Sequence, residues 1–221
     1  APYPEGSFDL IFSSHVLEHV RDLDQSVSDM VRLLRPGGVL CVTLPCANEG
    51  SLESTLTSLM RDGIITSPTG ERKWFWEDPT HLRRVRSDDL VARFKYHGLR
   101  LCEAFFGNQF WGGIEGVCQC GPGIIGKWLR VSKGNGITAR VKLAAAKLVL
   151  YAVSPIYLAL FDPVEKAGRF RGSKKLLCYA AVPIRWLYLP VARWIRKMAD
   201  KEWDERRHIP KGASQFLVMQ K

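Results

Sequence analysis

The sequence FDLIFSSHVLEHV at residues 8–20 and the sequence LLRPGGVLCVTLP at residues 33–45 together decide the fold. Phe8 to Phe12 is a mostly apolar run that follows a short turn-forming segment. A strand that is apolar on both faces is typical of the centre of a parallel sheet with helices on each side. Val39 to Leu44 has the same character, and Pro45 ends it. The sequence therefore predicts two buried strands.

A helix is predicted between these two strands. Asp22 or Asp24 can cap its start, Arg35 favours its end, and the segment 36–38 stops it. Strand, helix and strand within about forty residues form a βαβ unit, whose crossover is nearly always right-handed. The apolar residues of the helix follow a period of 3.6 residues and form one stripe: Leu23, Val27, Met30, Val31 and Leu34.

The rest of the chain predicts one further helix and two further strands. Residues 47–80 are polar and have no clear periodicity, whereas Ser87 to Asp89 open a helix that Gly98 ends. Leu99 to Phe106 predicts a third strand, and Gln215 to Met219 predicts a fourth. About 108 residues lie between these strands, far more than a hairpin needs, so they are interpreted as an insertion.

Charge is divided unevenly along the chain. Residues 1–106 contain 12 Lys and Arg against 15 Asp and Glu, whereas residues 107–221 contain 20 against 7. The predicted organisation is therefore an α/β part at residues 1–106, a basic helical insertion at 107–212, and a final strand at 213–221. The six cysteines form no C-x-x-C pair, which favours reduced thiols and a cytoplasmic setting.

Three stretches resemble the class I S-adenosylmethionine-dependent methyltransferases, in the broad group called type 11 or type 12. The first is the pair of segments quoted above, the second is DPTHLRRVRSDDLVARFKYHGLRL at 78–101, and the third is SQFLVMQK at 214–221. Their order and spacing make the match specific. The resemblance covers roughly residues 1–106 and 213–221, and it implies a partial Rossmann-like sheet and S-adenosyl-L-methionine as the cofactor.

The resemblance also implies which strands this chain contains. The family's sheet has the strand order 3-2-1-4-5-7-6 with strand 7 antiparallel, and this chain supplies the equivalents of strands 4 to 7. The glycine-rich cofactor loop of the family is not found in these residues, so the chain is expected to be N-terminally truncated and inactive alone. Leu10 to Phe12 would then form an unpaired, apolar edge strand, which natural proteins avoid unless something covers it.

Residues just past the first strand are the predicted cofactor contacts. By resemblance, Ser13, Ser14 and His15 border the bound cofactor, and short polar side chains suit the carboxyl ends of strands. The alternative is that the two serines only terminate the strand.

A metal site is a second possibility in the same region. His15, Glu18 and His19 share one face if residues 15–19 form a helical turn. Some relatives with a Glu-x-x-Glu-His motif here bind a divalent ion, completed by a downstream histidine, which would be His81. A histidine in place of the first glutamate weakens the case for Mg²⁺, which prefers oxygen ligands. The alternative is that Glu18 and His19 cap and brace the following helix, and no metal ligand is assigned.

The predicted catalytic residues are His81 and Asp78. A histidine can accept a proton near neutral pH, and by resemblance His81 lies in the loop that closes over the methyl acceptor. Asp78 could orient it. The alternative is a surface histidine that merely precedes a helix.

The insertion alternates apolar runs with basic residues. Leu148 to Phe161 is too short to span a bilayer and is interrupted by Pro155. A later segment predicts an amphipathic helix with Arg193, Arg196 and Lys197 opposite an apolar stripe that suits an anionic membrane surface: Leu187, Val191, Trp194, Ile195 and Met198. The alternatives are a helical subdomain that packs on itself, and, less favoured, a nucleic-acid surface.

The sequence thus predicts a methyltransferase that O-methylates a small-molecule, lipid-linked or saccharide acceptor near a membrane surface. The protein would be cytoplasmic and could associate peripherally with the membrane. Two alternatives are an RNA methyltransferase that uses the basic lobe, and a catalytically inactive module for binding or membrane docking.

Overall fold

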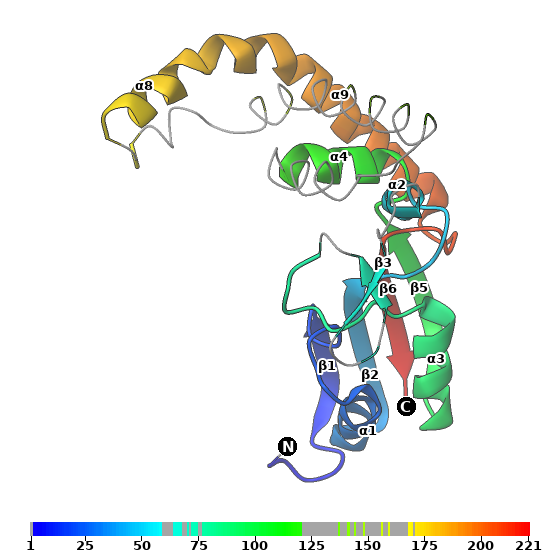
Figure 1. Cartoon of the computed structure of the whole chain (residues 1–221). Helices are drawn as coiled ribbons and strands as arrows, with labels where there is room; N and C mark the ends of the chain where they lie inside the picture. Colours follow the sequence, from blue (N-terminus) through cyan, green and yellow to red (C-terminus); the bar gives the residue numbers. More distant parts are fainter. Residues whose placement is uncertain are drawn as a thin grey trace. The chain divides into compact units, whose positions relative to one another are not determined.

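The chain forms two compact units in a computed structural model. The structure describes residues 2–58, 64–67, 70, 72–74, 77–120 and 171–221, together with isolated positions between residues 120 and 171. The first unit comprises residues 1–58, 62–109 and 203–221, and the second comprises residues 59–61 and 110–202. Figure 1 shows both units and labels most of their helices and strands.

A four-stranded mixed sheet organises the first unit (Figure 1). Its order is β1 (Phe8–Ser14), β2 (Leu34–Pro45), β6 (Ser214–Gln220) and β5 (Arg100–Gly107). β1 runs parallel to β2, whereas β6 is antiparallel to both β2 and β5. This is the order 4-5-7-6 with an antiparallel strand 7, so the predicted α/β fold with a partial class I sheet is confirmed.

Two predicted helices pack beside this sheet. α1 (Leu23–Leu33) begins at Asp22, whose carboxylate accepts a hydrogen bond from the backbone N–H of Gln25 at 2.9 Å. α3 (Ser87–Tyr96) ends before Gly98, whose φ of +87° is in the left-handed region that glycine adopts without strain. Together with the strands they bury one hydrophobic core, whose fully buried members include Val27, Leu34, Leu40, Val42, Leu90, Phe94, Leu217 and Met219.

The boundary between α1 and β2 differs from the prediction. The helix ends at Leu33, and Leu34 is already extended and pairs with Phe8 in β1. Arg35 therefore does not end the helix but forms an ion pair with Asp9. The register shifts between Phe8 and Leu10, and this irregularity accommodates the proline and glycines within the strand.

Short elements occur in residues 47–80, where the sequence shows no clear periodicity. They are α2 (Leu52–Ser58), β3 (Ile64–Thr66) and β4 (Arg72–Trp74), with β3 antiparallel to β4. The apolar residues of α2, Leu52 and Leu56, span only one turn, and hydroxyl groups within the helix donate to preceding carbonyls, as Thr57 does to Glu53 at 2.7 Å. Strands of three residues are too short to show a period of two.

The described elements of the second unit are helical: α4 (Trp111–Cys120), α8 (Ser173–Ala180) and α9 (Val182–Arg206), whose last residues belong to the first unit. The buried carboxylate of Glu202 in α9 accepts hydrogen bonds from the backbone N–H groups of Phe110, Trp111 and Gly112, and so caps α4. The predicted apolar run from Leu148 to Phe161 lies largely outside the described residues. No helix among the described residues is long and apolar enough to cross a bilayer.

We expect Leu217→Ala to lower the free energy of unfolding by about 2–5 kcal/mol, because the substitution leaves a cavity at a fully buried position in β6. Urea denaturation followed by circular dichroism measures this loss. Tyr96→Ala, at a side chain that is 87% exposed, is the control and should change stability by no more than about 0.5 kcal/mol. Equal effects of the two substitutions would contradict the central position of β6.

Candidate functional site

The candidate site lies where β1 and β2 end. Ser13 is buried near the end of β1, Ser14 is exposed, and the chain then reverses at His15, which has a φ of +51°. The backbone N–H of His15 donates to the carbonyl of Thr43 in β2 at 2.9 Å. Both loops that follow these parallel strands therefore start at one edge of the sheet, where open α/β sheets bind ligands.

Residues 17–19 form a turn and residues 15–19 contain no α-helix, yet this segment brings polar side chains together. Glu18 is fully buried, and one of its carboxylate oxygens lies 3.0 Å from Nδ1 of His15. Among the described residues, the other oxygen, Oε2, has no hydrogen-bond partner, and neither has the buried hydroxyl of Ser13. Buried polar atoms without partners are costly, so these two atoms mark places where a polar ligand would be stabilised.

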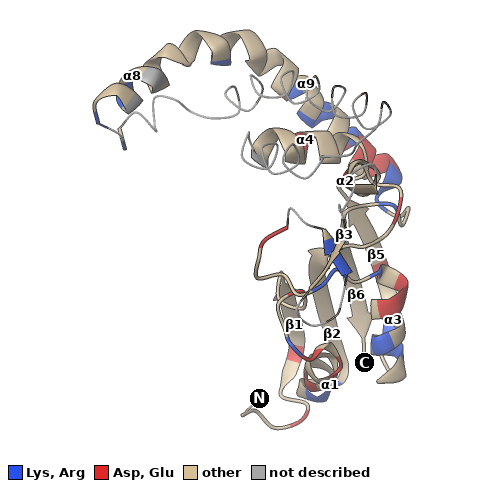
Figure 2. Cartoon of the chain, viewed as in Figure 1, with Lys and Arg blue, Asp and Glu red and all other residues tan. Residues whose placement is uncertain are grey.

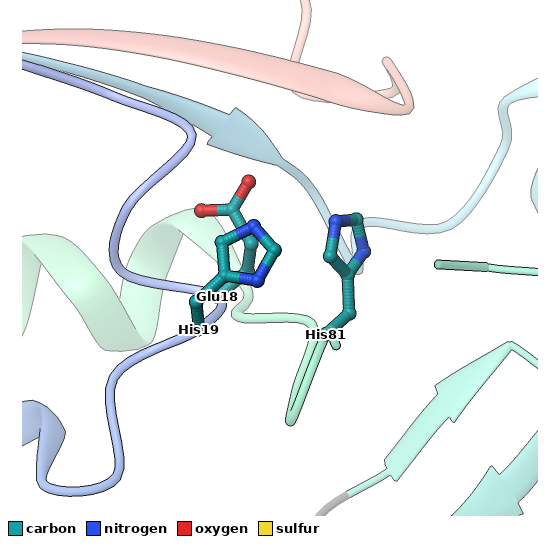
Figure 3. A group of neighbouring side chains, drawn as sticks. All are labelled: Glu18, His19 and His81. Atoms are coloured by element: carbon teal, nitrogen blue, oxygen red, sulfur yellow. The ribbon is translucent and has the colours of Figure 1, made fainter. Parts of the chain in front are cut away.

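His19 and His81 face each other across the site, as Figure 3 shows. Their ring centroids are 4.7 Å apart in an edge-to-face arrangement. Nδ1 of His19 lies 3.2 Å from the carbonyl oxygen of Thr80, and Nδ1 of His81 lies 3.2 Å from a carboxylate oxygen of Glu77. If each Nδ1 carries the proton in these bonds, each Nε2 is left with a free lone pair. Such a nitrogen can accept a proton or bind a metal.

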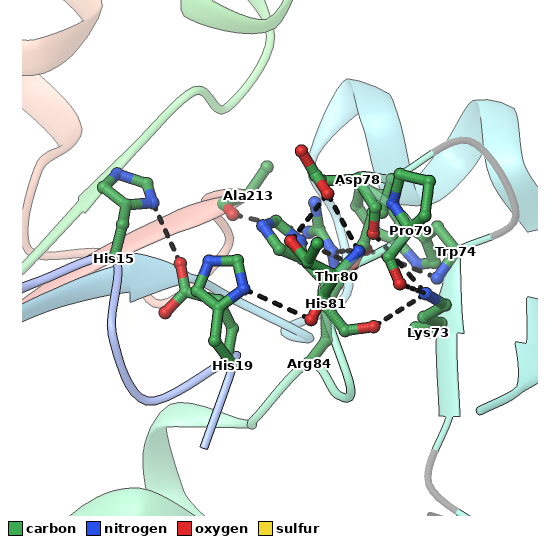
Figure 4. Close-up of polar contacts among 12 residues, drawn as sticks. His15, His19, Lys73, Trp74, Asp78, Pro79, Thr80, His81, Arg84 and Ala213 are labelled. Carbon is green, nitrogen blue, oxygen red and sulfur yellow. Dashed lines mark hydrogen bonds and ion pairs between the residues drawn. The ribbon is translucent and has the colours of Figure 1, made fainter. Parts of the chain in front are cut away.

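The carboxylate that holds His81 is that of Glu77, and not that of Asp78 as predicted. Asp78 instead accepts hydrogen bonds from the backbone N–H of Thr80 at 2.8 Å and from its hydroxyl at 2.6 Å. These two bonds lower the pKa of Asp78. Because the Thr80 carbonyl contacts His19, Asp78 shapes the loop that holds both histidines (Figure 4).

Glu77 is itself fixed by Arg84, a residue that the sequence analysis did not single out. The two buried side chains form an ion pair, and the guanidinium of Arg84 lies 3.3 Å from the ring centroid of Trp74. Arg84 also donates to the carbonyl of Cys46 at 2.8 Å and to that of Ala213 at 3.5 Å, the second of which Figure 4 draws. A charge-assisted chain therefore runs from the end of β2 through Arg84 and Glu77 to His81.

A second arginine joins the two loops of the site. The guanidinium of Arg83, which is 1% exposed, donates to the carbonyls of Leu17, Val20 and Arg21. The backbone N–H of Leu82 donates to the carbonyl of Glu18 at 2.8 Å. Nothing in a single sequence distinguishes Arg83 and Arg84, in LRRVR, from surface arginines. The partners of Arg83 are more than sixty positions away, and Glu77, the partner of Arg84, lies in a segment without clear periodicity.

Glu18, His19 and His81 could hold a divalent metal ion. One ligand atom from each lies within 4.8 Å of the others. Two imidazoles and one carboxylate suit a transition metal such as Zn²⁺ better than Mg²⁺. Cys46 is a poor additional ligand, because burial raises the pKa of its thiol to about 11 and keeps it protonated.

Comparisons with known proteins agree with a methyltransferase-type fold. A family model described as a methyltransferase domain matches residues 1–42. The dimethylglycine N-methyltransferase of Parasynechococcus marenigrum is 29% identical over 110 residues, which are 42% of this chain and 39% of that protein. A "Probable S-adenosylmethionine-dependent methyltransferase" of Mycolicibacterium smegmatis is 46% identical over 44 residues, 20% of this chain and 17% of that protein.

Among solved structures, a methyltransferase from Archaeoglobus fulgidus has a TM-score of 0.39 and 14% identity, covering 99% of this chain and 61% of that chain. The resemblance to the class I methyltransferases is confirmed by the family match and by the curated relatives. The chain spans less than two fifths of the length of the two curated relatives named above.

We expect Arg84→Ala to lower the free energy of unfolding by about 3–5 kcal/mol, because it leaves the buried carboxylate of Glu77 without its cation. Arg84→Lys should restore part of this loss, since it returns the charge without the planar guanidinium. Denaturant titration measures both variants. An Arg84→Ala protein as stable as the wild type would show that the buried ion pair is not formed.

Proposed function

We propose that this protein transfers a methyl group from S-adenosyl-L-methionine to an acceptor bound at the carboxyl ends of β1 and β2. The observation that carries the proposal is the parallel pairing of β1 with β2 within a segment that matches the methyltransferase domain. The pairing puts Ser13, Ser14 and His15 at the edge where such sheets bind their ligands. A relative whose name includes S-adenosylmethionine-dependent methyltransferase supports this choice of cofactor.

Ser13, Ser14 and His15 are the proposed cofactor-binding residues. The buried Ser13 hydroxyl without a partner supports this role, because a polar group of a bound ligand would satisfy it. The sulfonium of the cofactor is positively charged, so a buried carboxylate in the loop after β1, such as that of Glu18, would favour it electrostatically.

His81 is the proposed general base, and Asp78 is proposed to assist through the loop that it stabilises. An oxygen acceptor must lose its proton as its oxygen attacks the methyl carbon and the sulfonium leaves as a neutral thioether. Nε2 of His81 would accept this proton while Glu77 holds the opposite ring nitrogen. Glu77 thus takes the orienting role that Asp78 had in the prediction.

The proposed acceptor is a small molecule, a saccharide or a lipid-linked molecule that is methylated on oxygen near a membrane surface. The basic and aromatic character of residues 107–212 supports this location, and a cytoplasmic protein with peripheral membrane association is the matching localisation. The charge of the same residues would also suit an RNA acceptor, and a module that binds without catalysis is a third candidate. Product analysis with each class of acceptor separates these functions.

We expect His81→Ala to lower the rate of methyl transfer by about 10²–10⁴-fold, because a positioned general base contributes that much. Cofactor affinity, measured by calorimetry on the intact natural polypeptide, should stay unchanged. Asp78→Asn is the comparison variant and should reduce the rate much less, because Asp78 does not hold the His81 ring. Full turnover by His81→Ala would rule out the base.

The metal alternative is tested in the same assay. A base acting by itself should be insensitive to EDTA, so methyl transfer should be retained after chelation and dialysis. A loss of activity that added Zn²⁺ restores in the wild type, but not in Glu18→Gln, would instead assign Glu18, His19 and His81 to a metal.

A further inference from the structure

The helix α9 has three distinct faces along residues 182–199. One face is buried: Ala192, Ile195 and Ala199 are at most 8% exposed, and Ala192 and Ile195 share a core cluster with Cys118 of α4. A residue of the predicted apolar stripe, Ile195, therefore packs inside the second unit rather than facing out. Leu187, Val191 and Trp194, from the same predicted stripe, are instead exposed to solvent.

A second face of α9 is apolar and exposed to solvent. Leu187 is 71% exposed, Trp194 is 51% exposed and Val191 is 40% exposed, and their spacing of four and three residues aligns them along the helix. Ile184, at 37%, extends the same line by one turn. We call these four residues the exposed stripe. Burying these apolar side chains against an apolar phase is favourable, whereas their exposure to water is not. The exposed stripe therefore indicates a surface that binds an apolar partner.

The third face is basic. Arg193, Arg196 and Lys197 are all exposed, and Figure 2 shows basic residues along α9. Residues 173–198 contain six Lys and Arg and no Asp or Glu. Arg196 is ion-paired with Glu115 at 3.2 Å and Asp200 at 3.7 Å, which leaves Arg193 and Lys197 as the main contributors to the potential on this side. The face complements an anionic surface.

We propose that α9 lies in the interface of an anionic lipid bilayer, with the exposed stripe among the upper acyl chains and Arg193 and Lys197 at the headgroups. Helices that lie parallel to a membrane surface typically have an apolar face that includes tryptophan and a neighbouring basic face. Trp186, which is 73% exposed, and Leu176 and Tyr179 of α8, at 72% and 48%, add apolar surface close by in the sequence. A nucleic acid would use the basic face but would leave the aliphatic residues of the stripe in water.

This inference rests on the part of the proposed function that brings the acceptor to a membrane, and it names the lipid partner and the residues that contact it. It is tested by flotation of the full chain with vesicles of phosphatidylcholine alone or of phosphatidylcholine and phosphatidylserine in equal amounts. We expect binding to the anionic vesicles only, weakening as salt is added, because the basic face supplies part of the attraction.

The double variant Leu187→Asp with Val191→Asp should weaken binding at least about tenfold, since it puts two carboxylates into the stripe. Both positions are exposed, so the fold should persist, and circular dichroism checks this. Tyr96→Asp is the matched control, because it puts a carboxylate at an exposed aromatic residue of α3, and its binding should equal that of the wild type. Arg193→Glu with Lys197→Glu should also weaken binding, whereas the charge-conserving double variant Arg193→Lys with Lys197→Arg should not.

Wild-type binding by the Leu187→Asp, Val191→Asp variant, or equal binding to both kinds of vesicle, would overturn the inference. So would a tighter association with single-stranded RNA that displaces the vesicles, which would assign the basic face to nucleic acid. Flotation requires neither cofactor nor acceptor. A failure here with intact cofactor binding would therefore remove the membrane partner and leave the methyl-transfer proposal standing.

Discussion

The whole candidate site depends on how the N–H donors of the buried guanidinium of Arg83 are satisfied. Its N–H groups donate to the carbonyls of Leu17, Val20 and Arg21, in the loop after β1, while its backbone belongs to the segment that leads into α3. A cation this deeply buried is tolerated only where its donors are satisfied, so the two loops must stay together. The proximity of Glu18, His19 and His81 is a consequence of this constraint.

The candidate site also contains charged groups of both signs, most of them buried. Arg84 and Glu77 satisfy each other, and Glu77 then holds His81, so this side of the site is electrostatically complete. The other side is incomplete within the described part of the chain, because one carboxylate oxygen of Glu18 and the buried hydroxyl of Ser13 have no hydrogen-bond partner there. A polarised arrangement of this kind is preorganised for a ligand with a positive or proton-donating group. The sulfonium of the cofactor and the hydroxyl of the proposed oxygen acceptor are groups of these two types.

The sheet could be predicted from the sequence because its strands are continuous apolar runs punctuated by turn residues, as in Val39 to Leu44 before Pro45. The clustering of His81 with Glu18 and His19 could be anticipated only through the family resemblance. The sequence could not show that Glu77, and not Asp78, contacts His81. Both carboxylates precede His81, and the geometry of the loop decides between them. The start of β2 could not be predicted either, because Pro36 to Gly38, which usually stop a helix, here form an irregular strand segment.

The uneven distribution of charge gives the two parts of the chain different electrostatic preferences. Residues 1–106, with 15 acidic against 12 basic side chains, contain the candidate site and favour a cationic ligand such as a sulfonium. Residues 107–221, with 20 basic against 7 acidic side chains, favour an anionic surface. One surface of uniform sign would attract one of these partners and repel the other. In the proposed function, this separation along the chain would let the same polypeptide bind a cationic cofactor and an anionic membrane surface.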